Sequence, residues 1–320
     1  MDEIQLSPQA LQVPQEELLY FWALGDMHYL AHPAWQALHT PRLGLMFQDL
    51  RRLWAQEGAP AFCVSPGDII EKSSPQQYQL ARQALSLNLG TVPFYPGLGN
   101  HELSTANQES QAELWEDFTI FWEKPPRYYW VAGEVLCIML DVVGYPDPVL
   151  THESLAFLET ALAKHPQHIA IVFAHCPLYG TVLDRDEQRD LDYDSLQPYF
   201  YLENSEEVRA ILGRHTNACL YISGHTHSGW QAPNLVLTTD QGGHPLTTVN
   251  LLSPWYTGKH RGIEWLNNGE TCRYCPDEPD IVVSWAVHVY RDTVHLRLRD
   301  HRAGNWLAEW TVPTRYNEES

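Results

Sequence analysis

The stretch Cys219-Leu-Tyr-Ile-Ser-Gly-His-Thr-His227 joins a short apolar run to two histidines that directly follow a glycine. The apolar part has the length and composition of a buried β-strand. In an extended backbone, imidazoles at positions i and i+2 lie on the same face of the chain. Neutral imidazole nitrogens are ligands of Zn, Fe, Mn and Ni. The stretch therefore favours a metal site at a strand end, although two such histidines alone more often mark a half-exposed strand face.

Five apolar, strand-like runs of this chain end in side chains of the same chemical kind. In chain order these side chains are Asp26 and His28, then Asp68, then Asn100 and His101, then His175, and last His225 and His227. Strands of one parallel sheet place their carboxyl ends at a common edge, where ligands bind in open α/β sheets. We therefore expect these side chains to meet. They are too many for one tetrahedral ion, but they suit two ions that share a carboxylate, for which Asp68 is the candidate.

Strand-like and helix-like segments alternate in the first part of the chain. Apolar residues recur at helical spacing from Leu43 to Trp54, between strand-like runs that end at Leu24 and Ser65. Further on we expect a hairpin over residues 128–143 and a helix from Ser205, as its N-cap, to His215. Strand-like runs dominate the last third. This order predicts an α/β fold with two mixed β-sheets flanked by helices, a four-layer α/β/β/α sandwich.

No linker divides the chain. We expect a polar N-terminal arm over residues 1–17 and a single domain over residues 18–315. Two stretches, residues 179–204 and 259–280, lack the periodicity of either helix or strand. Long irregular segments in a compact domain are usually lids, binding loops or mobile segments, so both stretches are predicted to be insertions, and either could cover a substrate.

The charge balance restricts the partners of the protein. Forty acidic residues against 20 basic ones give a formal net charge of −20, so the surface field repels polyanions and offers no basic footprint for double-stranded nucleic acid. Carboxylates that bind divalent cations would reverse this field locally. A small phosphorylated substrate is therefore compatible with the charge, and the oligomeric state is left open.

The six cysteines indicate a reducing compartment. Cys63, Cys137 and Cys219 lie in apolar, strand-like runs, where a free thiol behaves as a small hydrophobic side chain. Cys272 and Cys275 form a lone CxxC with no second pair, which favours a loop with two thiols over a zinc or redox site.

The N-terminal residues lack the basic and apolar regions of a secretory signal. No run of about 18 apolar residues follows, so no membrane partner is expected. The sequence predicts a cytoplasmic protein.

Taken together, the motifs resemble the signature of the calcineurin-like metallophosphoesterases. The motifs are Asp26-x-His28, Gly67-Asp68, Gly99-Asn100-His101-Glu102, His175 and Gly224-His225-x-His227, all in the order of the family between residues 24 and 230. The resemblance implies two divalent metal ions, from among Mn, Fe, Ni and Zn, with Mn or Fe favoured. It implies that Asp26, His28 and His227 hold one ion, that Asn100, His175 and His225 hold the other, and that Asp68 bridges them.

The resemblance also implies a mechanism and two further site residues. In such centres the ions lie about 3.5–4 Å apart, and a bridging hydroxide attacks the phosphoryl group in line. His101 would be the family's non-ligand histidine, which stabilises developing charge or protonates the leaving alkoxide. Glu71 stands where many relatives carry an aspartate that orients this histidine. Glu71 would either hydrogen-bond His101 and raise its pKa or be an exposed residue at the start of a helix.

We expect a metal-dependent hydrolase of phosphate esters. A small phosphodiester is favoured slightly over a monoester, because the acidic segment 179–204 is an unusual wall for a multiply charged anion. Two alternatives remain: a non-catalytic binding or scaffold protein on the same fold, and a monoesterase like the Ser/Thr protein phosphatases. The intact ligand set speaks against the first. The second is disfavoured because Gly67-Asp68 does not continue as Asp-Arg-Gly and no arginine precedes Gly99.

Overall fold

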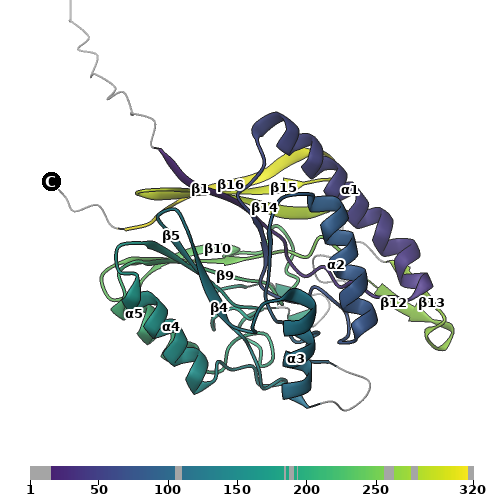
Figure 1. Cartoon of the computed structure of the whole chain (residues 1–320), viewed down its shortest axis with the longest axis horizontal. Coiled ribbons are helices and arrows are strands. Elements are labelled where there is room, and N and C mark those ends of the chain that lie inside the picture. Colours follow the sequence, from purple (N-terminus) through teal and green to yellow (C-terminus); the bar gives the residue numbers. More distant parts are fainter. Residues whose placement is uncertain are drawn as a thin grey trace, which may run out of the picture.

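Two six-stranded mixed β-sheets lie face to face, as the computed structural model shows (Figure 1). In spatial order the first sheet consists of β16 (Asn305–Pro313), β15 (Thr293–Asp300), β14 (Val283–Tyr290), β1 (Glu17–Ala23), β2 (Cys63–Ser65) and β3 (Phe94–Pro96). The second consists of β10 (Val236–Asp240), β11 (Pro245–Asn250), β9 (Ala218–Ser223), β6 (Ile169–Phe173), β5 (Val135–Met139) and β4 (Tyr128–Ala132). The structure describes residues 16–104, 110–183, 185–186, 191–192, 194–255, 263–274 and 280–315.

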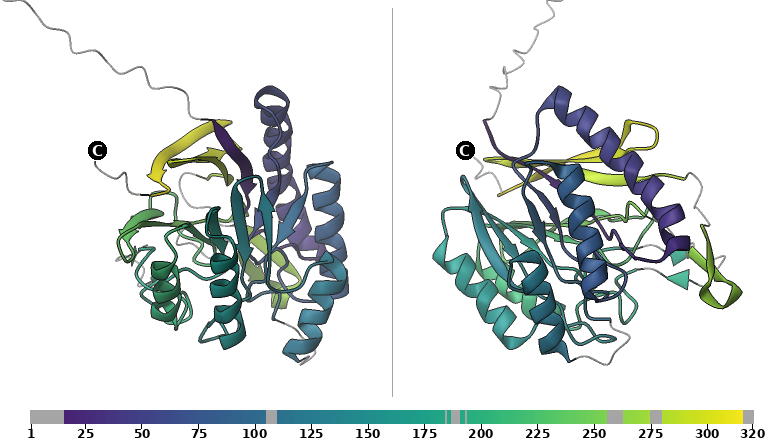
Figure 2. Two further views of the ribbon diagram at one scale, coloured as in Figure 1. Left: turned by 60° about the vertical axis from the view of Figure 1, so that its left-hand side comes forward. Right: turned by 45° about the vertical axis from the view of Figure 1, so that its right-hand side comes forward.

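Helices cover the outer face of each sheet (Figure 2). The helices α1 (Pro33–Glu57), α2 (Pro75–Leu89) and α3 (Gln111–Trp122) belong to the first sheet, and α4 (His152–Lys164) and α5 (Ser205–Arg214) to the second. The four-layer α/β/β/α sandwich predicted from the sequence is confirmed.

The core has three apolar layers because strand side chains alternate between the two faces of a sheet. On β1, Phe21 points between the sheets and lies 5.9 Å from the ring of Phe173. Its neighbour Trp22 points the other way and belongs, with Tyr78 of α2, to the layer under the outer helices. Leu158 of α4 belongs to the third layer, outside the second sheet. All five side chains are fully buried.

The parallel parts of both sheets bring the predicted strand ends together. Strands β1, β2 and β3 run parallel to one another, as do β5, β6, β9 and β11. Parallel neighbours finish at the same edge of a sheet, so the loops that leave these strands gather there. The antiparallel strands β14, β15 and β16 extend the first sheet on the side away from β3.

The entry to α5 differs from the sequence-based expectation. Its N-cap is Asn204 instead of Ser205, and the Asn204 amide pairs with the backbone of Leu150 at 2.9 and 3.1 Å. The Ser205 hydroxyl is bonded to the Leu202 carbonyl and accepts the backbone N–H of Tyr179. The prediction was wrong because these tertiary bonds, rather than a local cap, fix the start of the helix.

Both segments predicted to be irregular contain short strands. They are β7 (Arg185–Asp186) with β8 (Leu191–Asp192), and β12 (Ile263–Leu266) with β13 (Thr271–Tyr274), each an antiparallel pair. The second pair is held against α1, where Trp265 stacks on Trp35 with 5.9 Å between ring centroids. A two-stranded hairpin has only marginal stability alone, so this pair depends on its contact with α1. The local sequence pattern does not reveal a contact between residues so far apart in the chain.

The structure describes only part of the predicted N-terminal arm (residues 1–17) and of the CxxC (Cys272 and Cys275). Strand β1 already begins at Glu17, whereas residues 1–15 are outside the described ranges. Cys272 is a free thiol on β13, and its predicted companion Cys275 also falls outside.

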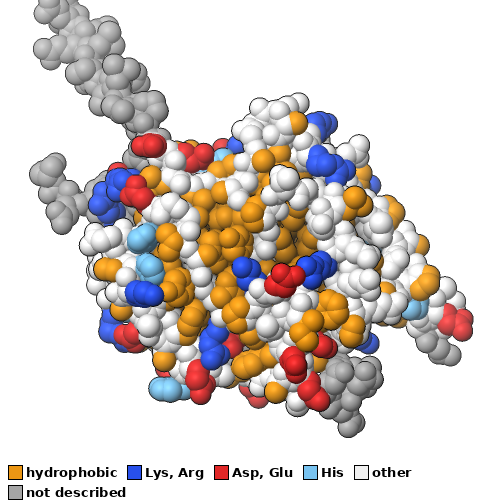
Figure 3. Space-filling model, in the orientation of Figure 1, with side chains coloured by type: hydrophobic (Ala, Val, Ile, Leu, Met, Phe, Trp, Pro, Cys, Tyr) orange, Lys and Arg blue, Asp and Glu red, His pale blue; other side chains and the backbone are white. Residues whose placement is uncertain are grey.

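One face of the molecule gathers hydrophobic side chains at its centre, with acidic and basic side chains around them (Figure 3). Exposed apolar side chains include Leu87 on α2 and Ile120 on α3. Within the described ranges, no helix has the length and apolar character that crossing a membrane requires.

Candidate metal centre

The loops after five strands converge at one edge of the two sheets and bring seven predicted donors together. Asp26 and His28 follow β1, Asp68 follows β2, Asn100 follows β3, His175 follows β6, and His225 and His227 follow β9. Six of these side chains are buried, and Asn100 is partly buried.

The first group of donors consists of Asp26, His28, Asp68 and His227, whose ligand atoms all lie within 4.8 Å of one another. The Nε2 atoms of His28 and His227 are 3.0 Å apart. Nε2 of His28 lies 4.0 Å from Oδ2 of Asp68, and Nε2 of His227 lies 4.0 Å from Oδ1 of Asp26.

The second group is centred on His175. Its Nε2 lies 3.1 Å from Oδ2 of Asp68, 3.0 Å from Oδ1 of Asn100 and 3.1 Å from Nδ1 of His225. Asp68 belongs to both groups, and the same Oδ2 atom approaches both. The geometry therefore has two donor sets joined by one carboxylate.

The donor chemistry fits a pair of divalent cations. Pairs of imidazole nitrogens face each other at about hydrogen-bond distance, and Oδ2 of Asp26 is buried with no hydrogen-bond partner among the described residues. Buried carboxylates without such partners are costly unless a cation compensates them. Mixed imidazole and carboxylate donors suit Mn, Fe, Ni or Zn, and two open donor sets suit two ions.

Backbone strain concentrates on the same residues. His28, Asp68, His225 and His227 all have positive φ angles, between 47° and 73°, a region that residues with a β-carbon rarely adopt. Each such residue costs on the order of 1–3 kcal/mol and persists only where its surroundings enforce it. The unusual backbone conformation of these tight loops directs four donor side chains toward the centre.

Two glycines are required by the close approach of carboxylates. A β-carbon on Gly99 would lie 2.3 Å from Oδ1 of Asp68, and one on Gly224 would lie 2.6 Å from Oδ2 of Asp26. Any side chain there would displace a donor. This explains physically why a glycine precedes Asn100 and His225.

Neighbouring groups fix which ring nitrogen of each histidine faces the centre. Oε2 of Glu71 lies 2.8 Å from Nδ1 of His28, which leaves Nε2 for the first donor group. The carbonyl of Tyr199 accepts Nε2–H of His225 at 2.8 Å, which leaves Nδ1 for the second. Such outer contacts orient metal-ligating histidines in known sites.

Tyr199 is a site residue that sequence reasoning missed. Its hydroxyl accepts Nδ2–H of Asn100 at 3.1 Å, so Oδ1 of the amide faces His175. Together with its carbonyl bond to His225, this contact orients two members of the second group. Tyr199 comes from the segment 179–204, and no local motif marks it.

His101 lies beside the two donor groups rather than in them. Its Nδ1–H donates to the backbone carbonyl of Glu71 at 2.7 Å, and its Nε2 lies 3.9 Å from Oδ2 of Asp68. Burial opposes protonation, but the carboxylates of Asp68 and Glu71 outweigh it and raise the pKa of His101 to about 9. The side chain is 26 % exposed, so Nε2 can reach a bound molecule.

Glu71 contacts two histidines, His101 and His28. Its side chain is only 18 % exposed and it precedes α2, so it is not an exposed helix residue. Its carbonyl orients His101, while its carboxylate lies 3.4 Å from Nδ1 of His101 and closer to His28. The two contacts connect His101 with the first donor group.

Glu102 is a second residue whose role the sequence did not reveal. Its buried carboxylate accepts four backbone N–H groups, those of Asp68, Ile69, Ile70 and Gly99, at 2.7–3.1 Å. These bonds tie the loop after β2 to the loop after β3. Burial and the nearby charge of Asp68 raise the pKa of Glu102. In the sequence, only its position directly after Asn100 and His101 pointed to a role of Glu102 in the site.

The titratable groups of the centre perturb one another. Burial opposes ionisation of Asp68, but His175, His101 and His28 hold its pKa well below the usual range. Burial and the adjacent His175 lower the pKa of His225 to about 3. A cluster in which both carboxyl and imidazole groups have strongly shifted pKa values is typical of functional sites.

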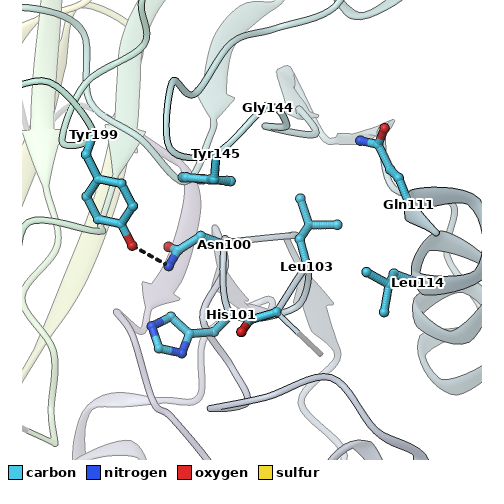
Figure 4. Close-up of a pocket in the computed structure, with 9 residues that line it drawn as sticks. Asn100, His101, Leu103, Gln111, Leu114, Gly144, Tyr145 and Tyr199 are labelled. Carbon is cyan, nitrogen blue, oxygen red and sulfur yellow. Dashed lines mark hydrogen bonds between the residues drawn. The ribbon is translucent and has the colours of Figure 1, made fainter. Parts of the chain in front are cut away.

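A pocket of about 530 Å³ opens beside the centre (Figure 4). It is lined by Asn100, His101, Leu103, Ser104, Gln111, Leu114, Gly144, Tyr145 and Tyr199. Figure 4 shows Tyr199 and Tyr145 across the pocket from Gln111 and Leu114, with Asn100 and His101 on the side of the tyrosines.

The comparisons with known proteins agree with this fold. The model of the calcineurin-like phosphoesterase family matches residues 19–229. A dimetal phosphatase from Danio rerio is similar in structure, with 14% identity and a TM-score of 0.60 over 93% of this chain and 100% of that chain. GAP50 of Plasmodium, described as the anchor in the inner membrane complex, has 12% identity and a TM-score of 0.57 over 95% and 91%. No curated protein sequence matches the chain.

Proposed function

The chain belongs to the calcineurin-like phosphoesterase family, and we propose that it hydrolyses phosphate ester bonds with two divalent cations. The proposed ligands are Asp26, His28 and His227 for one cation and Asn100, His175 and His225 for the other, with Asp68 shared. The observation that carries the proposal is the position of Asp68 Oδ2 between the two donor groups.

When bound, two such cations act as Lewis acids that acidify water and neutralise phosphoryl oxygens. His101 would supply the proton that the leaving oxygen needs, because its Nε2 faces the centre, 3.9 Å from Oδ2 of Asp68. The Glu71 carbonyl accepts Nδ1–H, which leaves Nε2 as the ring nitrogen that faces the centre.

We propose a small phosphodiester ahead of a monoester as substrate. The described residues that line the pocket include no lysine or arginine that could neutralise the second charge of a monoester. A diester carries one charge less and two organic groups, and the pocket offers apolar and aromatic walls for one of them.

Mn or Fe is proposed as the native metal, ahead of Ni or Zn, since availability decides among metals that accept these donors. A cytoplasmic location is also proposed. It is supported by Cys63, Cys137, Cys176 and Cys219, which are buried free thiols in the described part of the chain.

The test is hydrolysis of bis-p-nitrophenyl phosphate and p-nitrophenyl phosphate by the Mn²⁺-loaded protein. We expect turnover that a chelator abolishes, that His101→Ala lowers by about 100-fold or more, and that is faster with the diester. His152→Ala, at an exposed site on α4, is the matched control and should retain full activity.

Two outcomes favour the alternatives. Metal binding without turnover of either ester would support a binding or scaffold protein, and the structurally similar GAP50 is described as an anchor. Faster turnover of the monoester, extended to phosphoserine peptides, would support a monoesterase of the protein phosphatase kind.

A further inference from the structure

We propose that the pocket beside His101 is a leaving-group subsite that takes an uncharged, flat organic group of the substrate, an inference that rests on the proposed function. Nothing in the family signature defines this pocket, because only Asn100 and His101 among its lining residues belong to that signature.

The position of His101 indicates that the pocket binds the leaving group of the substrate. A proton donor must lie within hydrogen-bond reach of the oxygen that departs. His101 both faces Asp68 with its Nε2 and lines the pocket. The group bonded to that oxygen therefore extends into the pocket, whose 530 Å³ is in the range of small-molecule sites and exceeds what a phosphoryl group needs.

The aromatic wall presents rings instead of hydroxyls. The Tyr145 hydroxyl lies 3.1 Å from Sγ of Cys176, and the Tyr199 hydroxyl is bound to the Asn100 amide. The two ring centroids are 6.0 Å apart with planes inclined at 65°. Ring faces and edges of this kind bind flat groups.

The opposite wall is apolar with a polar rim. Leu103 and Leu114 line it (Figure 4), and the lining residues Ser104 and Gln111 are exposed and able to form hydrogen bonds. Apart from His101, the described residues around the pocket carry no charged side chain. A charged group would lose hydration here without gaining a partner, whereas an uncharged ring would bury apolar surface.

The first experiment compares two nonhydrolysable phosphonates by calorimetric titration of the Mn²⁺-loaded protein. We expect benzylphosphonate to bind at least about tenfold more tightly than methylphosphonate, because a phenyl ring in this pocket buries apolar area. Equal affinities would overturn the proposal.

The second experiment compares hydrolysis of benzyl and ethyl phosphate esters, whose leaving alcohols have similar acidity. We expect the benzyl ester to have the lower KM. Leu103→Asn makes one wall polar, and Gln111→Trp fills the pocket from an exposed position at the start of α3. Each should reduce the benzyl preference to less than about threefold. Leu87→Asn, on exposed α2 surface, is the control that should keep the preference.

The outcomes separate this proposal from the proposed function. Hydrolysis of both esters with equal KM would refute the subsite and leave the phosphoesterase intact. Tighter binding of benzylphosphonate without hydrolysis of any ester would support the subsite and refute the enzyme. A benzyl preference that survives both pocket variants would place the ring elsewhere and overturn the subsite.

Discussion

Oε2 of Glu102 accepts the backbone N–H of Asp68 at 2.8 Å, although the two residues lie 34 positions apart in the chain. The same oxygen accepts Gly99 N–H at 2.7 Å, so one buried carboxylate fixes two loops of the metal centre. The shape of the centre thus depends on a residue that is not itself a proposed ligand.

Glu102→Gln should therefore loosen the centre. The amide NH₂ of glutamine cannot accept, so it would leave two buried N–H groups unpaired at a cost of about 1–3 kcal/mol. We expect a lower free energy of unfolding in urea and weaker Mn²⁺ binding by calorimetry. Glu116→Gln, at an exposed site on α3, should change neither quantity. Unchanged Mn²⁺ affinity in Glu102→Gln would refute the positioning role.

The metal content of variants should distinguish a metal ligand from the proton donor. Asp68→Asn removes the shared charge and should weaken binding of both cations by at least about 100-fold, since even outer-shell changes reach that range. His101→Ala should keep both cations and lose turnover. Elemental analysis after desalting, beside the kinetics, distinguishes the two. Loss of metal from His101→Ala would show that His101 is itself a ligand.

Tyr199→Phe should affect the second donor group alone. It removes the hydroxyl that orients Asn100 but leaves the backbone carbonyl that binds His225. We expect about a tenfold weaker second Mn²⁺ site in a calorimetric titration, with the first site unchanged. Equal weakening of both sites would contradict the assignment of Asn100 to one cation. Tyr179→Phe, in the same segment, is the control.

His39 should make the fold sensitive to mild acid. Burial lowers its pKa to about 4, and its Nε2–H binds the carbonyl of Met27 at 2.7 Å. Between pH 6.5 and 4 the unfolded chain binds a proton that the folded chain does not, so stability falls as the pH falls, by up to about 3 kcal/mol.

His39→Gln keeps an N–H donor for Met27 and removes the titration. Urea unfolding of the chelator-treated protein should therefore depend less on pH in the variant than in the wild type. His152→Gln, at an exposed site, should show the wild-type dependence. Parallel pH profiles for His39→Gln and the wild type would rule out His39 as the source.

Asp49 should anchor the first sheet to α1. Its carboxylate binds Arg299 at 2.8 and 3.1 Å and Nδ1 of His301 at 3.0 Å, and all three side chains are buried. Asp49→Asn leaves the Arg299 charge buried without its counter-ion, so we expect a loss of about 3–5 kcal/mol in urea unfolding at pH 7. Glu134→Gln breaks an exposed pair with Arg291 and should cost less than about 1 kcal/mol.

The pH dependence of this loss has a definite sign. Burial opposes ionisation of Asp49, but His301, Arg299 and Arg52 hold its pKa well below the usual value. A carboxyl whose pKa is lower in the folded state stabilises above its unfolded pKa of about 4 and loses this effect as the pH falls. The difference between Asp49→Asn and the wild type should therefore shrink below pH 4.

The sequence by itself determined the layer order and the donors that meet at the sheet edge. Both follow from local patterns: the spacing of apolar residues defines strands and helices, and polar residues after parallel strands share one edge. The tertiary structure alone decided what supports those donors. Glu102, Tyr199, the dual contacts of Glu71 and the cap of α5 all depend on partners far apart in the chain, as with the 99 positions between Asn100 and Tyr199. Periodicity carries no information about such pairs, because each is made only when the packed core brings the two segments together.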